Sequence, residues 1–338
     1  MAQKYQIEKL SRNTWLSRIQ RGLRYGDRLW QVLLIGMAIL VVVIILAIGW
    51  LLARDSAIAR TQFGWSFILP SKEIAWNPVA NSFRSWPFIY GTLATSVLAI
   101  ILALPLSLGI AIFLAELCPV WLRIPLGIMV ELLAAIPSVI YGLWGIFVFL
   151  PAVVTPIGLF LGSSLGYIPG LQVFFCGQIS PSGASRLAAG LILAIMIIPT
   201  IAAVSRDVFL AIPRAQREAS FSLGATQWET ISRVLIPYGL SGILGAVILG
   251  LGRALGETMA VTMVIGNSIE GSLSMLRPGY TMSSVIANEF AEAVSKLHSQ
   301  VLIEVAFILF FMTLVLNAVA RLLVWRVGRR TSLEVRIC

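Results

Sequence analysis

The most constraining feature of this sequence is a stretch of 25 residues, 29–53, that contains no charged side chain. At a rise of 1.5 Å per residue, an α-helix of that length can cross the roughly 30 Å hydrocarbon core of a bilayer. Twenty-eight residues precede the stretch, and it is longer than the apolar region of a signal peptide. We therefore expect a membrane helix that is retained rather than cleaved.

The composition extends this expectation to the whole chain. Hydrophobic residues make up 58% of the 338 and charged residues only 12%, against about 25% charged in soluble domains. A water-soluble protein of this size could not bury so much apolar surface, and a disordered chain would contain far less of it. Three distant cysteines also exclude a disulfide scaffold. The sequence indicates a polytopic membrane protein.

Five further apolar segments are long enough to span a membrane. They are predicted at 88–115, 124–150, 186–208, 236–266 and 301–325. None shows the alternating ten-residue pattern of a β-barrel, and the prolines inside them are tolerated in membrane bundles. The predicted fold is an all-α membrane protein with six transmembrane helices.

The basic residues are distributed unevenly around these segments. If both termini are cytoplasmic, 17 lie on the inner side and 6 in the outer loops, which are predicted at 54–87, 151–185 and 267–300. Such a bias fixes membrane orientation, so the net charge of +10 does not indicate nucleic-acid binding. The predicted regions are a basic cytoplasmic segment 1–28, a first helix with its outer loop 29–87, a transmembrane domain 88–325 and a cytoplasmic tail 326–338.

Several activities lack the residues that they require. No lysine follows a glycine, so the chain has no phosphate-binding P-loop and is not expected to bind ATP in that way. The single histidine, His298, is predicted to be a solvated loop residue. With no metal cluster and no catalytic set, we expect no enzyme activity, no catalytic residues, no bound metal and no cofactor.

The cytoplasmic loop 213–237 has the pattern of two short helices. Pro213 can begin the first helix, Glu218 lies in an early turn, and Gly224 can end it in a left-handed conformation. The second helix has residues at spacings of three and four that would form one apolar face. These residues are Trp228, Ile231 and Leu235.

This loop resembles the EAA loop of ABC importer permeases, in which Glu-Ala-Ala, a glycine and a hydrophobic-Pro segment follow at fixed spacing. The matching residues are Glu218-Ala219-Ser220, Gly224 and Val234-Leu235-Ile236-Pro237, with small departures at Ser220, Val234 and Ile236. The resemblance implies that Glu218, Ala219, Ser220 and Gly224 belong to coupling helices that dock on a separate ATPase subunit. The alternative is an amphipathic linker on the membrane surface.

Three other segments resemble the phosphate-specific subfamily of these permeases: Tyr90–Ser96, Ile136–Gly142 and Gly252–Thr258. The resemblance implies a type I importer fold in a bacterial inner membrane that works by alternating access. It also implies partners: a homologous permease subunit, two ATPase subunits that use ATP, and an outer phosphate-binding protein. The long basic N-terminus and the large loop after the third span indicate one of the two sister permeases of that subfamily.

Arg253 and Glu257 are charged residues within the predicted fifth span. Four residues apart, they would share one helix face and pair, which offsets part of the ~2.5–3.5 kcal/mol cost of a lone intramembrane arginine. Arg253 could supply positive charge and a planar donor fork to an oxyanion, or the pair could only fix helix register. The resemblance links both residues to transport.

A second set of polar residues ranks lower as lining of the path: Thr92, Thr95, Ser138 and Glu131. The hydroxyls of the threonines and the serine more commonly bond to the helix backbone. A buried glutamate such as Glu131 more commonly pairs with an arginine. Gly252 and Gly256 are interpreted as a close helix-packing motif.

The expected function is that of a permease subunit for inorganic phosphate. One alternative is a permease for another oxyanion, such as sulfate or molybdate, because a single arginine does not distinguish tetrahedral anions. A second alternative is an ATP-independent secondary transporter in which Glu257 is the coupling carboxylate, although the internal repeats common in such proteins are absent.

Overall fold

The computed structural model describes residues 2–334, apart from 71–75, 79, 167, 170, 171, 178 and 270. The side chains of residues 2–27, 29 and 327–334 lie outside this description, as do residues 335–338. The basic side chains of segment 1–28 other than Arg28, and the side chains of the predicted tail beyond Arg326, thus lie outside the described residues. The chain forms two compact units, Met1–Arg54 and Asp55–Cys338.

The first unit consists of one long helix, α1 (Ala2–Asp55), which continues from the basic N-terminal segment into the apolar stretch. Its part from Trp30 to Asp55 is strongly apolar and long enough to cross a membrane. A helix that is apolar on every side is suited to lipid. It corresponds to the span predicted at 29–53.

Six helices in the described part of the chain are long and apolar enough to cross a membrane. They are Trp30–Asp55, Trp86–Leu117, Ser138–Ser164, Arg186–Ala211, Gln227–Gly256 and Lys296–Arg326. The prediction of an all-α, six-span fold is confirmed. The strands in the described residues are one short antiparallel pair, β1 (Trp76–Asn77) and β2 (Ser82–Phe83), in the first outer loop.

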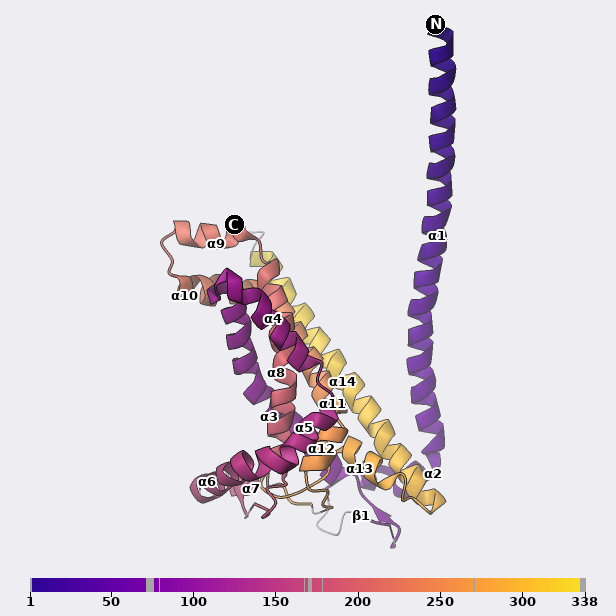
Figure 1. The fold of residues 1–338 in the computed structure, drawn as a ribbon. Coiled ribbons are helices and arrows are strands. Elements are labelled where there is room, and N and C mark those ends of the chain that lie inside the picture. Colours follow the sequence, from indigo (N-terminus) through magenta and orange to yellow (C-terminus); the bar gives the residue numbers. More distant parts are fainter. Residues whose placement is uncertain are drawn as a thin grey trace. The chain divides into compact units, whose positions relative to one another are not determined.

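The second unit is a helical bundle with short helices at both ends (Figure 1). Its first half contains α2 (Ala57–Phe63), η1 (Gly64–Phe67), α3 (Trp86–Ile112), η2 (Phe113–Leu117), α4 (Val120–Ala134), α5 (Ser138–Trp144), η3 (Gly145–Val154), α6 (Thr155–Leu165) and α7 (Gln172–Phe175). Its second half contains α8 (Arg186–Ala211), α9 (Arg214–Ser222), α10 (Gln227–Glu229), η4 (Thr230–Leu235), α11 (Ile236–Gly256), α12 (Met259–Val264), α13 (Met282–Glu289) and α14 (Lys296–Glu334).

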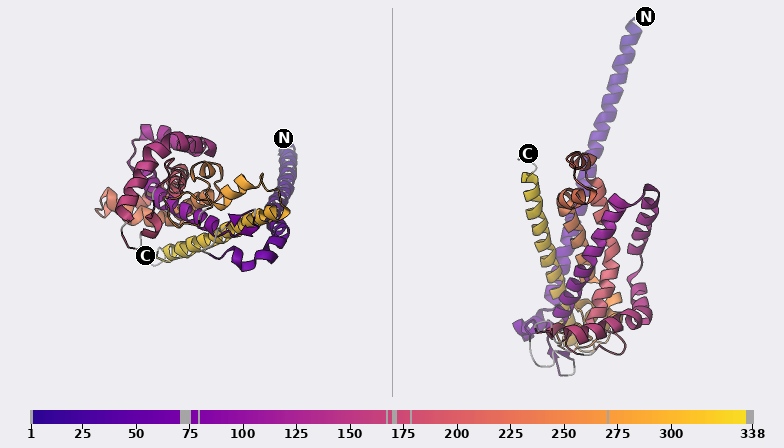
Figure 2. Two further views of the ribbon diagram at one scale, coloured as in Figure 1. Left: turned by 90° about the horizontal axis from the view of Figure 1, so that it is seen from below. Right: turned by 90° about the vertical axis from the view of Figure 1, so that its left-hand side faces the viewer.

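Helix α8 lies at the centre of this bundle and is the most deeply buried of the membrane helices (Figures 1 and 2). It packs against α3, α4 and α11. Small residues on α8 permit the close approach of α3: a Cβ atom added at Gly190 would lie 2.6 Å from a methyl carbon of Leu98. The central core therefore depends on small side chains, as is usual where helices pack within a membrane.

The third predicted span, 124–150, is divided in the structure. Helix α4 ends at Ala134, Pro137 is extended, and a new helix begins at Ser138 and continues through η3 and α6. A proline has no N–H to donate and its ring clashes with the preceding turn, which explains the break. The spanning segment is Ser138–Ser164, so the predicted outer loop 151–185 is helical in its first part.

The fifth predicted span, 236–266, is divided as well. Helix α11 ends at Gly256, and Glu257 has the extended dihedral angles φ −70° and ψ 125° before α12 begins at Met259. Glycine is weak within a helix and common at its end, which favours a break at this point. By contrast, Pro105 and Pro199 lie inside α3 and α8 without ending them.

The prediction that His298 is a solvated loop residue is wrong. It is only 6% exposed, its ring stacks on Phe83, and its Nε2 lies 3.1 Å from Glu289 Oε2. The same carboxylate accepts a hydrogen bond of 2.7 Å from Trp76 Nε1. The β1–β2 pair, α13 and the start of α14 together enclose the ring, and no local pattern around His298 indicates this enclosure.

Candidate functional site

The loop after α8 forms the two helices that its sequence predicts. Pro213 precedes α9, and Gly224 follows it with a positive φ of 84°. Only glycine adopts that conformation at no steric cost, so the turn depends on this residue. Thr226 begins α10 with a capping box, in which its hydroxyl accepts from the N–H of Glu229 and the Glu229 carboxylate accepts from the Thr226 N–H.

The two short helices are joined by a buried contact and present an apolar outer surface. The hydroxyls of Ser220 and Thr230 lie 2.9 Å apart. Of the three residues predicted to form one apolar face, Ile231 and Leu235 are buried and Trp228 is 69% exposed. Phe221 and Leu223 are exposed as well, and with Trp228 they form the apolar part of the outer surface of these helices. Glu218 and Ala219 of the predicted coupling set are also exposed.

Arg217 fixes α9 to the rest of the bundle. Its guanidinium binds both carboxylate oxygens of Glu116, with a shortest N–O distance of 2.7 Å, and donates to the carbonyls of Phe209 and Ile212. Glu116 belongs to η2 at the end of the second span. A bidentate, mostly buried pair of this kind is strong and directional, so it ties α9 to η2 at the end of α3.

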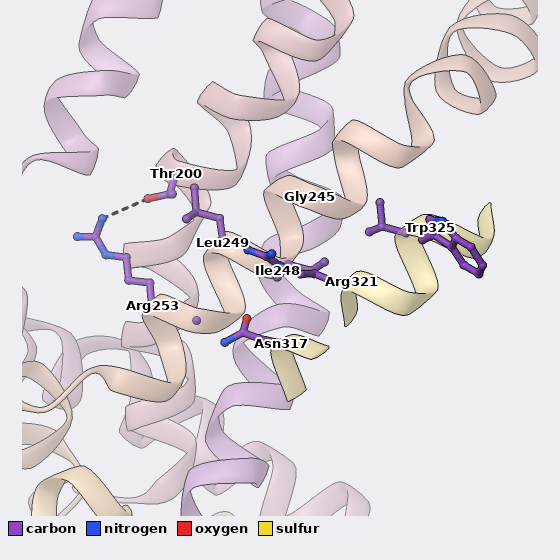
Figure 3. Close-up of a pocket in the computed structure, with 10 residues that line it drawn as sticks. Thr200, Gly245, Ile248, Leu249, Arg253, Asn317, Arg321 and Trp325 are labelled. Atoms are coloured by element: carbon purple, nitrogen blue, oxygen red, sulfur yellow. Dashed lines mark hydrogen bonds between the residues drawn. The ribbon is translucent and has the colours of Figure 1, made fainter. Parts of the chain in front are cut away.

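Arg253 extends from α11 toward two neutral oxygen atoms. Its Nη1 donates to the carbonyl of Ala134, at the end of α4, and to the hydroxyl of Thr200 on α8, both at 3.2 Å. Figure 3 shows the bond to Thr200. Within the described residues it has no carboxylate partner. The charge of this arginine is therefore held by dipoles and is not neutralised by a counter-ion.

The predicted pairing of Arg253 with Glu257 is wrong. Because α11 ends at Gly256, Glu257 no longer follows the helical spacing that would place it on the same face. Its Oε1 instead accepts from the backbone N–H of Ala260, 3.2 Å away, in the first turn of α12. Glu257 therefore caps a helix rather than holding an arginine.

A cavity of about 830 Å³ lies beside Arg253, between α8, α11 and α14 (Figure 3). Its lining consists of Thr200, Gly245, Ile248, Leu249, Gly252, Arg253, Asn317, Arg321, Val324 and Trp325. No described atom lies within 4 Å of a Cβ built at Gly252 or Gly256. The predicted close packing at these two glycines is thus absent within the described chain, and Gly252 widens the cavity instead.

The lower-ranking residues lie elsewhere and serve the fold. Thr92 and Thr95 are fully buried, and their hydroxyls donate to the carbonyls of Phe88 and Gly91. The Thr92 hydroxyl also accepts from the N–H of Met282 at 2.9 Å, which ties α3 to α13.

The remaining two candidates also lie outside the cavity. Ser138 is the partly exposed first residue of α5. Glu131 is 56% exposed and forms an ion pair of 2.8 Å with Arg206, as its preference for an arginine predicts. Neither residue lines the cavity beside Arg253.

The fold and this arrangement define a class of transport protein. Residues 107–333 match the family of binding-protein-dependent transport system inner membrane components, and the chain belongs to this family. The matched region contains both short helices, α9 and α10, and every residue that lines the cavity.

Relatives within this class narrow the comparison. The chain is 46% identical over 295 residues to the phosphate transport system permease protein PstC of Mesorhizobium japonicum, which covers 87% of this chain and 89% of the relative. It is 46% identical to PstC of Pasteurella multocida, with coverage of 87% and 90%. It is 37% identical to PstC 2 of Mycobacterium tuberculosis, with coverage of 93% and 96%.

Among solved structures, the chain is similar to the MetNI methionine ABC transporter in an inward-facing conformation. The identity is 18%, the TM-score is 0.48, and the match covers 72% of this chain and 93% of that one. An amino acid ABC transporter matches at 21% identity with a TM-score of 0.47, covering 71% and 92%.

Proposed function

We propose that this chain is a permease subunit of an ATP-driven importer and forms the path for inorganic phosphate across a bacterial inner membrane. The observation that carries the proposal is Arg253, a guanidinium within a membrane helix that bonds only to neutral oxygens at the edge of a cavity. An intramembrane charge without a counter-ion is costly, which favours a role in binding. Relatives named as phosphate permeases over most of their length support phosphate as the ion.

The contacts of Arg253 suit an ion that must pass rather than stay. The acceptors at Ala134 and Thr200 hold the guanidinium in place while the path is empty. A phosphate of about −1.5 charge attracts it more strongly than either neutral oxygen, so the bonds can exchange as the ion arrives. One arginine gives attraction without a deep trap, as conduction requires.

The exposed surface of α9 and α10 supports the coupling part of the proposal. Leu223 is 89% exposed and Trp228 69% exposed, beside Phe221. Adjacent large apolar residues on a protein surface favour an interaction with a partner. A partner ATPase subunit would cover this surface, and the Arg217–Glu116 pair would transmit its closure to the spanning helices by alternating access.

The proposed assembly contains a homologous PstA-like permease, two PstB-like ATPase subunits and a PstS-like phosphate-binding protein on the outer side. The chain itself is non-catalytic and binds no cofactor, and ATP is hydrolysed by the partner. The excess of basic residues on one side supports an orientation with both termini in the cytoplasm.

Labelled-phosphate uptake into proteoliposomes that contain the assembled complex tests this function. Uptake that needs ATP and the binding protein, and that persists after collapse of the proton gradient, is the expected result. ATP-dependent uptake of sulfate or molybdate instead of phosphate would show that the proposed substrate is wrong and that the proposed coupling to ATP is right. Uptake that follows the gradient and ignores ATP would contradict the importer.

The variant Arg253→Gln tests the residue that carries the proposal. Loss of one charge-assisted contact to the ion should lower uptake by roughly tenfold or more. The matched control is Arg206→Gln, since Arg206 is also an arginine of a spanning helix but binds two exposed carboxylates, Glu131 and Asp207. If the purified Arg253→Gln complex is intact and transports at the wild-type rate, Arg253 is not part of the path.

A further inference from the structure

The wall of the cavity opposite Arg253 is formed by one face of α14. Its lining residues are Asn317, Arg321, Val324 and Trp325, which follow the spacing of a single helix face. The facing residues on α11 extend from Gly245 to Arg253, about 12 Å along that helix. The cavity is therefore elongated along the helices, with Arg253 toward one end and Trp325 toward the other.

Arg321 is a second arginine without a counter-ion in this cavity. It lies five residues before the end of the candidate span Lys296–Arg326, and it has no ion-pair or hydrogen-bond partner in the described part of the chain. Asn317, one turn earlier on the same face, is likewise without a partner among the described residues. The ten described lining residues include two arginines and no carboxylate.

Two glycines on α11 leave space open in this cavity. No described atom lies within 4 Å of a Cβ built at Gly245 or at Gly252, and both residues line the cavity. A larger side chain at either position would extend into the cavity without displacing a neighbouring helix. The glycines thus leave room for an ion without being required for helix packing in this chain.

The position of Arg321 along the membrane gives the cavity a direction. Figure 1 and the right-hand view of Figure 2 show the C-terminal end of α14 at the same end of the bundle as α9. Arg321 is thus nearer to the coupling helices than Arg253, which lies 17 residues after α11 begins at that end. An anion moving inward would meet Arg253 first and Arg321 second.

We propose that Arg321 and Asn317 form a second binding step for phosphate, on the cytoplasmic side of Arg253. This step rests on the proposed function. A guanidinium fork and a side-chain amide are suitable donors for the oxygens of a tetrahedral oxyanion. Two moderate steps in sequence move an ion more readily than one strong site, because the ion must leave each of them.

A charge-matched pair of variants tests the second step in the reconstituted complex. In Arg321→Gln, uptake should fall by roughly tenfold or more while ATP hydrolysis stays within about twofold of wild type. Arg326→Gln removes the same charge from the same helix but lies outside the cavity, and it should transport normally. Equal losses in the two variants would indicate that Arg321 only anchors α14 at the lipid headgroups.

A second pair of variants tests the open space. Gly245→Leu should block uptake in an intact complex, because its side chain extends into the open space of the cavity. Gly36→Leu is the control, since Gly36 also has no atom within 4 Å of a built Cβ and lies on α1. Normal uptake by Gly245→Leu would show that the ion does not pass here.

Thiol labelling gives a readout that does not depend on transport. In a background with the three native cysteines replaced by serine, Gly245→Cys should react with a sulfonated, membrane-impermeant thiol reagent only if water fills the cavity. Inorganic phosphate should slow this reaction more than chloride at equal ionic strength, and Arg321→Gln should remove the difference. Unreactive cysteine, or equal protection in Arg321→Gln, would overturn the second step.

The two proposals fail differently. If the wild-type complex takes up no phosphate, the proposed function fails, whatever the variants do. If the wild type takes up phosphate and Arg253→Gln does not, but Arg321→Gln does at the wild-type rate, then only the second step fails.

Discussion

At the residue scale, Arg253 and Glu257 show how a local backbone break changes the meaning of a sequence spacing. Four residues apart on a continuous helix, they would pair. With α11 ending at Gly256, one contacts Thr200 and Ala134 while the other caps α12. Among the described residues the arginine has no carboxylate partner, as the proposed binding of an anion requires, and the glutamate bonds to the first turn of α12.

The capping role of Glu257 gives a prediction that separates it from a proton carrier. Glu257→Gln retains a side-chain oxygen that can accept from Ala260, so uptake should stay within about threefold of wild type. Glu257→Ala removes the cap and should cost about 1 kcal/mol of stability. Thermal unfolding and uptake measure the two effects. Abolished transport in the glutamine variant would contradict a purely capping role.

Sequence reasoning singled out Arg253, because an arginine in an apolar helix is unusual in itself, and the structure places it at the edge of a cavity. It did not find Arg321, which lies near the end of its span and follows the ordinary pattern of a basic residue at the cytoplasmic boundary. Only the structure places it beside Asn317 in the same cavity as Arg253. Contacts between distant parts of the chain carry no signal in the local pattern.

At the scale of elements, the two short helices α9 and α10 were the most predictable part of the molecule. Their boundaries depend on local chemistry: Pro213 before α9, Gly224 after it and Thr226 at the start of α10. The attachment of α9 through Arg217 and Glu116 was not predictable, because those residues are 101 positions apart. Local sequence rules therefore determine where these helices begin and end, whereas tertiary contacts determine how they are attached to the bundle.

The turn between these helices provides a prediction about coupling. The positive φ at Gly224 makes Gly224→Val strained by about 1–2 kcal/mol, whereas Gly224→Asn is tolerated better. No described atom lies within 4 Å of a built Cβ, so the strain arises from the backbone alone. The number of phosphate ions imported per ATP should fall in the valine variant and remain near wild type in the asparagine variant. Equal ratios would contradict a coupling role for this turn.

At the scale of the whole molecule, the bias of 17 basic residues against 6 predicts an orientation that native cysteines can report. Cys176 is exposed and follows α7 in the predicted outer loop, Cys118 is buried, and Cys338 belongs to the predicted cytoplasmic tail. An impermeant thiol reagent added to intact spheroplasts should label Cys176 alone. Labelling of Cys338 before lysis would place the termini outside.

The number of spans was predictable from composition. The points at which the helices break, and the enclosure of His298 by the loop segments around it, were not predictable. Pro137 ends a helix while Pro105 and Pro199 do not, and the difference depends on neighbouring helices. Likewise, His298 is buried by segments that are far from it in sequence, including Phe83. The energy that decides these features comes from packing across the bundle.

The cavity beside Arg253 has a consequence for the energy balance of the cell. Its ten described lining residues contain two permanent positive charges and no group that exchanges protons near neutral pH. If the proposed path runs through this cavity, its two positive charges repel sodium ions and hydronium, and none of its described lining residues is a carboxylate or an imidazole that could relay a proton. A permease with such a path admits an anion without short-circuiting the ion gradients on which the same membrane depends.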